Sequence, residues 1–281
     1  MALENIRTCP TFVINLDRRP DRWAEFSAQP VLSQFTSLQR FSAVDGSKID
    51  VLNDERISLH TRQNILLKSR RSHYEIATVG AIGATLSHVS LWKQFLETDA
   101  KYLVVFEDDT IVDETAMNYI DTLVGKLPAE WHMWLLGVHR GAFEGKPLVP
   151  GAPKGWWSVK KFTGAHAYIL SRKGAEILLE DPFPIETHIE FYITACAMLK
   201  GLILIKHWAL RMGYSMERTD EIDSDTFTGR ESCPVCYIPD NFPQVGFYIS
   251  YDDFYRKIAA ITALGFVGLG AYLGLRRGRK N

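Results

Sequence analysis

The chain has 281 residues, of which 46% are hydrophobic, 12% aromatic and 23% charged. This proportion of apolar residues supplies enough surface for a packed core and excludes a disordered chain. The formal net charge is -1, from 32 basic and 33 acidic residues, so no overall field draws the protein onto a nucleic-acid backbone. The length fits one α/β domain with an appendage.

The first predicted element is a short buried strand at residues 11–15 (TFVIN), followed by a charged turn and a helix with Pro20 in its first turn. A second strand is expected at residues 38–44, ending at the turn dipeptide Asp45-Gly46. Residues 49–74 show no clear period and are interpreted as a surface insert or lid. Because α/β sheets bind ligands at the carboxyl ends of their strands, both strand ends are candidate binding positions.

Apolar residues at three-to-four spacing predict a helix over residues 80–96, which leads into an apolar strand at residues 102–106 (YLVVF). This strand runs directly into Glu107, Asp108 and Asp109. Adjacent carboxylates repel one another, so a fold retains them easily only where a cation or hydrogen bonds compensate. Mg²⁺ or Mn²⁺ would do so, since both take carboxylate, water and phosphate oxygens. The alternative is a solvated acidic turn or a helix N-cap at Asp109.

The rest of the chain continues the α/β pattern. The expected segments are a strand at 133–137, a functional or mobile loop at 141–155, a strand at 162–170, a helix at 172–180, a short strand at 202–205 (LILI) and an acid-rich loop at 218–230. The four cysteines are too few and too scattered to staple the domain, which suits a reducing compartment. Cys233 and Cys236 have the spacing of half a zinc knuckle or a redox dithiol, or they flank a simple turn at Pro234.

Residues 258–275 carry no charge and are followed by the basic run RRGRK, which predicts a single-pass membrane anchor at the C-terminus. An amphipathic or core helix is the alternative. Gly270 and Gly274 form a GxxxG pair that would allow a homodimer through the anchor. The first residues show no secretory signal pattern, so we expect residues 1–250 to form a cytosolic catalytic domain.

Several motifs together resemble glycosyltransferase family 25, which includes lipooligosaccharide galactosyltransferases and collagen hydroxylysine galactosyltransferases. The resemblance covers most of residues 12–193, in the order found in the family. The blocks that carry it are FVINLDRRPDRW (12–23), RFSAVDG (40–46), GAIGATLSHVSLWKQFLE (80–97), YLVVFEDDTIV (102–112) and, more weakly, GAHAYILSRKGAEILLE (164–180) with PIETHIEFYI (184–193).

The resemblance implies a GT-A-like, Rossmann-type fold that binds a nucleotide sugar. It further implies a hexosyltransferase, expected to be inverting, that moves galactose or glucose from a UDP-sugar donor to a hydroxyl of a glycan or protein acceptor. The cofactor would be Mn²⁺ or Mg²⁺, held by the motif Glu107, Asp108 and Asp109. Because alternate strand residues share a face, we expect Glu107 and Asp109 to point toward the metal and ribose.

Candidate site residues follow from the same blocks. An acceptor hydroxyl must lose a proton, for which Glu190 is the preferred base and Glu186 the second candidate. His88 is expected to line the site, in place of the alternative role of a core histidine. Gly164, His166 and Tyr168 are expected to alternate along one strand on the acceptor side. The candidates for donor binding are Asn15, Asp17, Arg18, Arg22, Asp45 and Ser87.

One position departs from the family pattern. Family members often carry Glu in the block that here reads GAIG, where Ala81 has no carboxylate. A catalytically inactive, membrane-displayed module that binds sugar or protein is therefore the main alternative function. A Rossmann-type oxidoreductase is disfavoured, since the turn after the first strand has no glycine to cradle a phosphate.

Overall fold

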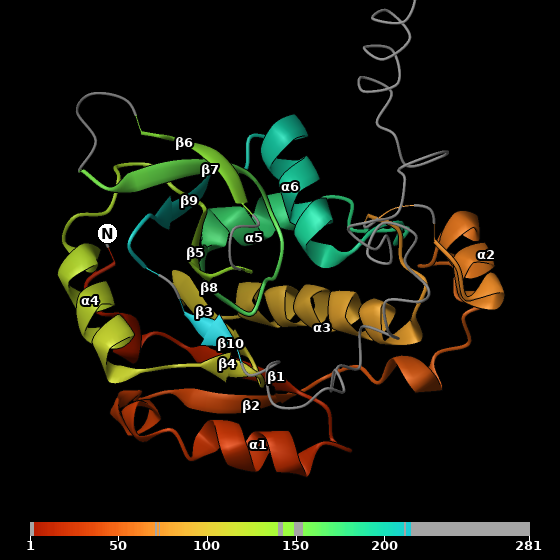
Figure 1. Cartoon of the computed structure of the whole chain (residues 1–281), viewed down its shortest axis with the longest axis horizontal. Helices are drawn as coiled ribbons and strands as arrows, with labels where there is room; N and C mark the ends of the chain where they lie inside the picture. Colours follow the sequence, from red (N-terminus) through yellow and green to blue (C-terminus); the bar gives the residue numbers. More distant parts are fainter. Residues whose placement is uncertain are drawn as a thin grey trace, which may run out of the picture.

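The computed structural model describes residues 3–70, 72, 74–139, 143–148, 154–210 and 212–214. Within this part of the chain the centre is an eight-stranded mixed sheet with the order β2-β1-β3-β8-β5-β9-β7-β6 (Figure 1). A two-stranded sheet of β4 and β10 accompanies it. The strands are β1 (Thr11–Asn15), β2 (Leu38–Ser42), β3 (Tyr102–Glu107), β4 (Thr110–Ile111), β5 (Met133–Gly137), β6 (Phe143–Pro147), β7 (Trp156–Phe162), β8 (Ala167–Ser171), β9 (Leu204–His207) and β10 (Gly213–Tyr214).

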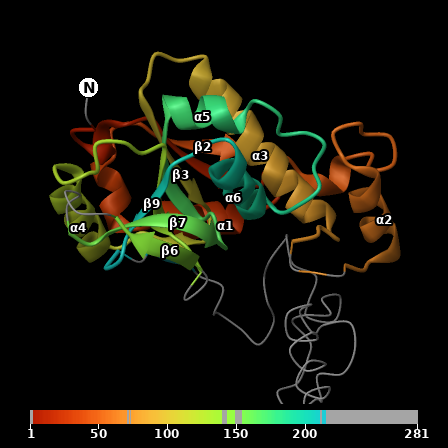
Figure 2. The ribbon, with the colours of Figure 1, turned by 90° about the horizontal axis from the view of Figure 1, so that it is seen from above.

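Helices cover both faces of the large sheet (Figures 1 and 2). Helices α1 and α4 pack on one face, where Phe26 and Met117 share a core with Val104. Helices α3, α5 and α6 pack on the other face, and α2 lies at the end of α3 away from α5. The helices are α1 (Pro20–Ser27), α2 (Leu59–Leu67), α3 (Val79–Leu96), α4 (Glu114–Val124), α5 (Arg172–Leu178) and α6 (Ile189–Leu199), with short 3-10 turns η1 (Ile6–Thr8), η2 (Pro30–Gln34) and η3 (Gly46–Lys48).

The directions of the central strands bring distant parts of the sequence to one edge. Strand β1 pairs parallel to both β2 and β3, and β8 runs antiparallel between β3 and β5. The last residues of β1, β2, β3 and β5 therefore lie at the same edge as the first residue of β8. These residues are Asn15, Ser42, Glu107, Gly137 and Ala167. The loops that leave this edge are where a sheet of this kind binds ligands.

The α/β class predicted from the sequence is confirmed, as are the principal elements. The strand predicted at 11–15 and the one at 133–137 have the predicted bounds, and the helix predicted at 80–96 begins one residue earlier, at Val79. Pro20 occupies the first turn of α1, where its fixed φ is suited to a helix and its missing N–H costs nothing.

Three predictions about segments were wrong or incomplete. The predicted strand at 162–170 is two strands, β7 and β8, because Gly164 has a φ of +79° and turns the chain between them. Gly164 and His166 lie between the two strands and Tyr168 lies in β8, so the predicted alternation of these three residues along one strand is wrong. The predicted loop at 141–155 contains the edge strand β6. Its sequence shows little alternation of apolar and polar residues, so the strand depends on its pairing with β7. The segment 49–74 contains α2, which Ser58 caps through its hydroxyl.

No helix of the described residues is long and apolar enough to cross a bilayer. The predicted anchor at residues 258–275, including Gly270 and Gly274, lies outside the described residues, as do Cys233, Cys236 and the acid-rich loop at 218–230.

Two glycines allow α3 to approach the loop after β2 closely. A Cβ on Gly83 would lie 2.4 Å from the carbonyl oxygen of Val44, and one on Gly46 would lie 1.9 Å from the carbonyl oxygen of Val79. Both neighbours are backbone atoms, which cannot move aside as a flexible side chain can. The loop at 43–47 is therefore pressed against the first turns of α3, and its position depends on both glycines.

We predict that Gly83→Ala lowers the free energy of unfolding by about 1–3 kcal/mol in urea denaturation, although alanine is the better helix former. Gly125→Ala is the control, since Gly125 ends α4 and a Cβ there meets nothing within 4 Å. The control should be neutral or stabilising by about 0.5 kcal/mol. If Gly83→Ala is as stable as the control, the close approach of α3 to this loop is not a constraint.

Candidate functional site

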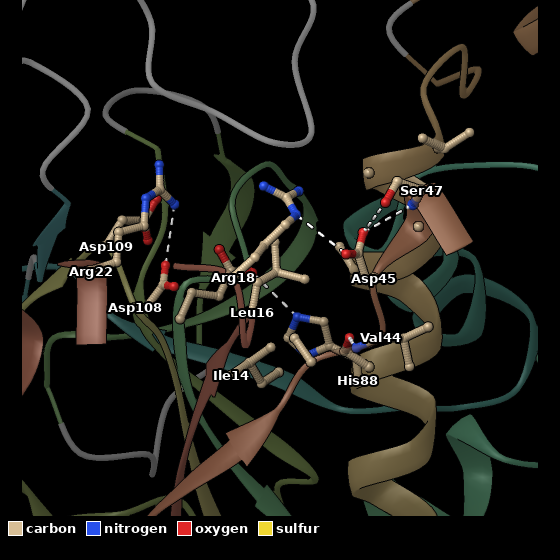
Figure 3. A pocket seen from close by; sticks show the side chains of 17 residues that line it. Ile14, Leu16, Arg18, Arg22, Val44, Asp45, Ser47, His88, Asp108 and Asp109 are labelled. Carbon is tan, nitrogen blue, oxygen red and sulfur yellow. Dashed lines mark hydrogen bonds and ion pairs between the residues drawn. The ribbon is translucent and has the colours of Figure 1, made fainter. Parts of the chain in front are cut away.

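A pocket opens at the edge where β1, β2 and β3 end (Figure 3). Its empty volume is about 810 Å³, counting the solvent open to it. Five segments line it: the end of β1 with the turn after it, the first turn of α1, the loop at 43–47, the first half of α3, and the acidic triplet. The predicted site residues that line it are Arg18, Arg22, Asp45, Ser87, His88, Glu107, Asp108 and Asp109.

The loop at 43–47 is held in place by hydrogen bonds from both sides. The Val44 N–H donates to Ser87 Oγ at 2.8 Å, and the Ser87 hydroxyl donates to the Gly83 carbonyl at 2.7 Å. Asp45 accepts from Ser47 N at 3.0 Å, and its other carboxylate oxygen lies 3.3 Å from Arg18 Nε. Hydrogen bonding to the Ser47 side chain is the main cause of a lowered pKa at Asp45. The pocket therefore has one rigid wall that carries a charged carboxylate.

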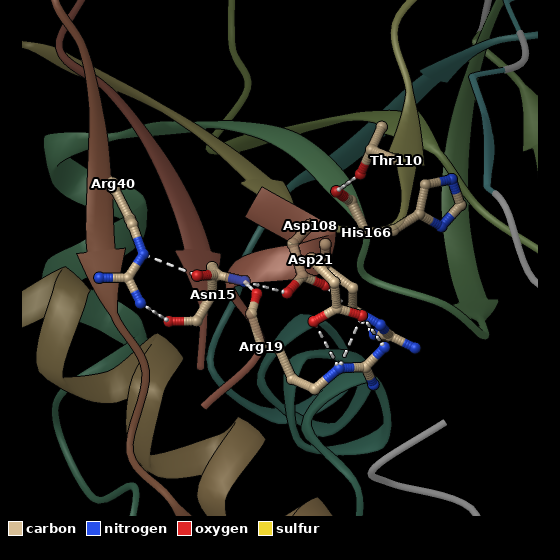
Figure 4. Close-up of polar contacts among 8 residues, drawn as sticks. Asn15, Arg19, Asp21, Arg40, Asp108, Thr110 and His166 are labelled. Atoms are coloured by element: carbon tan, nitrogen blue, oxygen red, sulfur yellow. Dashed lines mark hydrogen bonds and ion pairs between the residues drawn. The ribbon is translucent and has the colours of Figure 1, made fainter. Parts of the chain in front are cut away.

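Asp108 is neutralised by a network that extends behind the pocket (Figure 4). Asn15 Nδ2 donates to Asp108 Oδ2 at 2.7 Å, and Arg22 Nη1 lies 3.2 Å from Asp108 Oδ1. Arg40 Nε donates to Asn15 Oδ1 at 2.6 Å, so the amide must turn its NH₂ toward Asp108. Burial raises the pKa of Asp108, and Asn15 and Arg22 oppose that effect. Asn15, itself only 1% exposed, thus acts on the site through Asp108.

Asp109 is in a different position, because its buried Oδ1 has no hydrogen-bond partner among the described residues. Burial, and then the charges of Glu107 and Asp108, raise its pKa to about 7. An unpartnered carboxylate oxygen next to two further carboxylates fits a hard divalent cation. The described side chains hold no group of three or more His, Cys, Asp or Glu arranged as metal ligands. A cation here would therefore take much of its shell from water and bound phosphate.

Glu107 is the last residue of β3 and bonds to the helix behind the pocket. His88 Nε2 lies 3.2 Å from Glu107 Oε1. Burial acts to raise the pKa of Glu107, but the hydrogen bond with His88 and nearby histidines outweigh it, and the pKa falls below its ordinary value. Since β3 ends here, Asp108 and Asp109 lie in a turn. The expectation that Glu107 and Asp109 share a strand face therefore does not apply, although both line the pocket.

The two candidate bases differ in their surroundings. Glu190 lies in the first turn of α6 and receives a backbone hydrogen bond from Gly164. Burial first, and then the charge of Glu107, raise the pKa of Glu190, while His139 lowers it. Glu190 is half-buried and feels the charge of Glu107, whereas Glu186 is exposed outside the helix. Neither of the two lines the pocket.

Asp17 and Ala81 lie away from the pocket lining. Asp17 is exposed and pairs with Arg40 Nη2 at 2.7 Å and with the Ser42 hydroxyl at 2.8 Å. Ala81 is 3% exposed and packs in a small core at the start of α3. The missing carboxylate at this position is therefore replaced by apolar packing.

Residues that the sequence analysis gave no role also shape the site. Arg40 orients Asn15, and Trp92 donates a hydrogen bond to the Tyr168 hydroxyl behind His88. Tyr168, which was expected on the acceptor side, is fully buried and does not line the pocket. Arg40 stands in a motif block but sits within a strand, and Trp92 fits an apolar helix stripe. Neither pattern distinguishes a core residue from one that supports a site.

The chain is similar in sequence to members of one glycosyltransferase family. The model of a family described as "Glycosyltransferase family 25 (LPS biosynthesis protein)" matches residues 8–149. A Bos taurus protein named "Probable inactive glycosyltransferase 25 family member 3" is 28% identical over 182 residues, 60% of this chain and 28% of that protein. "Procollagen galactosyltransferase 2" of Mus musculus is 27% identical over 185 residues, 61% of this chain and 28% of that protein.

The chain therefore aligns with little more than a quarter of the length of these relatives. Among solved structures, a UDP-glucose pyrophosphorylase complexed with UDP-glucose matches with a TM-score of 0.38 and 11% identity. That match covers 74% of this chain and 91% of the other.

The raised pKa of Asp109 predicts a pH-dependent stability in metal-free protein. A carboxyl whose pKa rises from 3.8 to about 7 on folding stabilises the folded state while protonated, and this is lost as the pH rises through 7. Asp109→Asn should therefore match the wild type near pH 4 and exceed it at about pH 8. We expect a gain on the order of 2 kcal/mol in urea unfolding with EDTA, allowing for solvent screening.

Asp17→Asn is the control of opposite sign. The Ser42 hydroxyl and then Arg40 lower the pKa of Asp17, so its charge favours the folded state above the unfolded pKa. Asp17→Asn should not gain stability at about pH 8. A loss of stability in Asp109→Asn at that pH would contradict the assignment of Asp109 as an uncompensated carboxylate.

Proposed function

Because the chain belongs to glycosyltransferase family 25, we propose that it transfers a hexose, galactose or glucose, from a UDP-sugar to a hydroxyl of a glycan or protein. The transfer depends on Mn²⁺ or Mg²⁺ held by Glu107, Asp108 and Asp109. The observation that carries this proposal is the buried, unpartnered Oδ1 of Asp109 in a pocket that two arginines and four carboxylates line.

The charges around the pocket suit a nucleotide diphosphate. The bound cation would stabilise the negative charge that gathers on the diphosphate as the sugar–phosphate bond breaks. Arg22 and Arg18 line the same pocket and supply guanidinium groups that match phosphate oxygens. Asp45 and the backbone of the loop at 43–47 form the wall that would receive the nucleoside, with Ser87 holding that loop from behind.

Glu190 is proposed as the base of an inverting transfer. Its carboxylate takes the proton of the acceptor hydroxyl while that oxygen bonds to the anomeric carbon, and the bond from that carbon to the diphosphate breaks to release UDP. A pKa raised by burial makes Glu190 a stronger base than an exposed glutamate. In this proposal the acceptor would lie beside the first turn of α6, where Glu190 accepts a hydrogen bond from the Gly164 backbone.

Membrane attachment belongs to the same proposal. The apolar segment at 258–275 would anchor the catalytic domain at the cytosolic side of a membrane, and the Gly270–Gly274 pair would allow a dimer. A membrane-displayed binding module without activity is the second candidate. Several relatives carry the word "inactive" in their names, and this observation favours it.

We predict that the full chain releases UDP from one member of a panel of UDP-sugars only when Mn²⁺ is present. Asp109→Asn should reduce this release by about 100-fold or more, because it removes a negative charge from the cation site. Asp99→Asn, a change at an exposed position before β3, should behave as wild type. UDP binding by calorimetry without release from any donor would support the inactive module, and loss of both would contradict a nucleotide-sugar site.

The two candidate bases give a matched pair of variants. Glu190→Gln should lower kcat by about 10²–10⁴-fold with little change in donor KM, since only proton transfer is lost. Glu186→Gln, four residues earlier and exposed, should keep wild-type kinetics. Equal activity of Glu190→Gln and wild type in a steady-state assay with saturating acceptor would exclude Glu190 as the base.

A further inference from the structure

Behind the acidic triplet, three buried side chains form a hydrogen-bonded series that leads from the interior to Glu107. Trp92 and His88 are one helical turn apart on α3, and Tyr168 faces them from β8. Trp92 Nε1 donates to the Tyr168 hydroxyl at 2.9 Å, and that hydroxyl lies 2.8 Å from His88 Nδ1. The exposed fractions are 0% for Trp92 and Tyr168 and 1% for His88, so bulk water does not compete for these bonds.

The direction of each hydrogen bond follows from which groups can donate. The indole N–H of Trp92 can only donate, so the Tyr168 oxygen accepts from it. The Tyr168 hydroxyl hydrogen then has His88 Nδ1 as its acceptor. A neutral imidazole that accepts at Nδ1 carries its hydrogen on Nε2, which lies 3.2 Å from Glu107 Oε1. Every donor in this hydrogen-bonded series then has an acceptor.

The opposite tautomer would leave two mismatches. With its hydrogen on Nδ1, the imidazole would point an N–H at a hydroxyl that already accepts from Trp92, and the hydroxyl hydrogen would lose its acceptor. The bare Nε2 lone pair would then face the carboxylate of Glu107, which is acceptor-only when ionised. Each mismatch lies in a buried region, where an unsatisfied polar group is most costly.

We propose that Trp92 and Tyr168 are positioning residues that fix His88 as the Nε2–H tautomer, so that His88 holds Oε1 of Glu107 and leaves Oε2 for the pocket. The role of Glu107 toward a cation rests on the proposed function. Outer partners of this kind orient metal-binding carboxylates, and their loss typically weakens metal binding by about 10–100-fold. Tyr168 itself does not line the pocket, so it acts only through His88.

The test uses Tyr168→Phe in the full chain, with Tyr192→Phe as the matched control. Tyr192 also donates from its hydroxyl, to the Leu178 carbonyl at 2.8 Å, but this bond joins α6 to α5 and Tyr192 does not contact His88 or line the pocket. Long-range ¹H–¹⁵N NMR of the histidine side chains reports the tautomer without any substrate. Electron paramagnetic resonance of free Mn²⁺ in the presence of UDP then gives the affinity for the cation.

We expect the Nε2–H tautomer at His88 in the wild type and in Tyr192→Phe, and its loss or mixing with the Nδ1–H form in Tyr168→Phe. The Mn²⁺ affinity should fall by about 10-fold or more in Tyr168→Phe alone. The Nδ1–H tautomer in the wild type, or unchanged Mn²⁺ affinity in Tyr168→Phe, would overturn the inference while leaving the proposed function in place. If the wild type binds no Mn²⁺, the cation-dependence in the proposed function is contradicted. The role of Trp92 and Tyr168 in cation binding is then contradicted too, even where His88 has the expected tautomer.

Discussion

Glu107, Asp108 and Asp109 repel one another at the end of β3, and the surrounding side chains are arranged to offset this repulsion. Asp108 is compensated by Asn15 and Arg22, and Glu107 by His88. Asp109 feels the charge of Arg22, but its buried Oδ1 has no hydrogen-bond partner among the described residues and is the atom at which the proposed cation would bind. The different surroundings of these three adjacent carboxylates support the proposal that a bound cation completes the site.

Sheet topology makes this arrangement possible. Because β1 lies between β2 and β3 and runs parallel to both, the side chains after each strand meet at one edge although they are far apart in sequence. Helix α3 then links the two halves of the pocket: Gly83 and Ser87 hold the loop at 43–47, and His88, one residue on, holds Glu107. A change in the packing of α3 would therefore alter both the wall of the pocket and the acidic triplet.

The sequence predicted the parts of this site that depend on local pattern. A continuous apolar run that ends in carboxylates indicates a buried strand and a ligand-binding edge, and the structure confirms the strand and its place in the sheet. The network behind the site could not be predicted, because Arg40 looks like any polar strand residue and Trp92 like any core residue until tertiary contacts are known. The division of 162–170 into two strands depends on a positive φ at Gly164, and many glycines in strands do not adopt one.

The central claim is that the carboxyl edge of β1, β2 and β3 binds a nucleotide diphosphate through a divalent cation. A crystal of the full chain grown with UDP and Mn²⁺, and measured at a wavelength where manganese scatters anomalously, tests it most directly. The account predicts an anomalous peak within bonding distance of an Asp109 carboxylate oxygen, with the diphosphate of UDP on its other side. A peak elsewhere, or UDP bound with no manganese at the triplet, would contradict it.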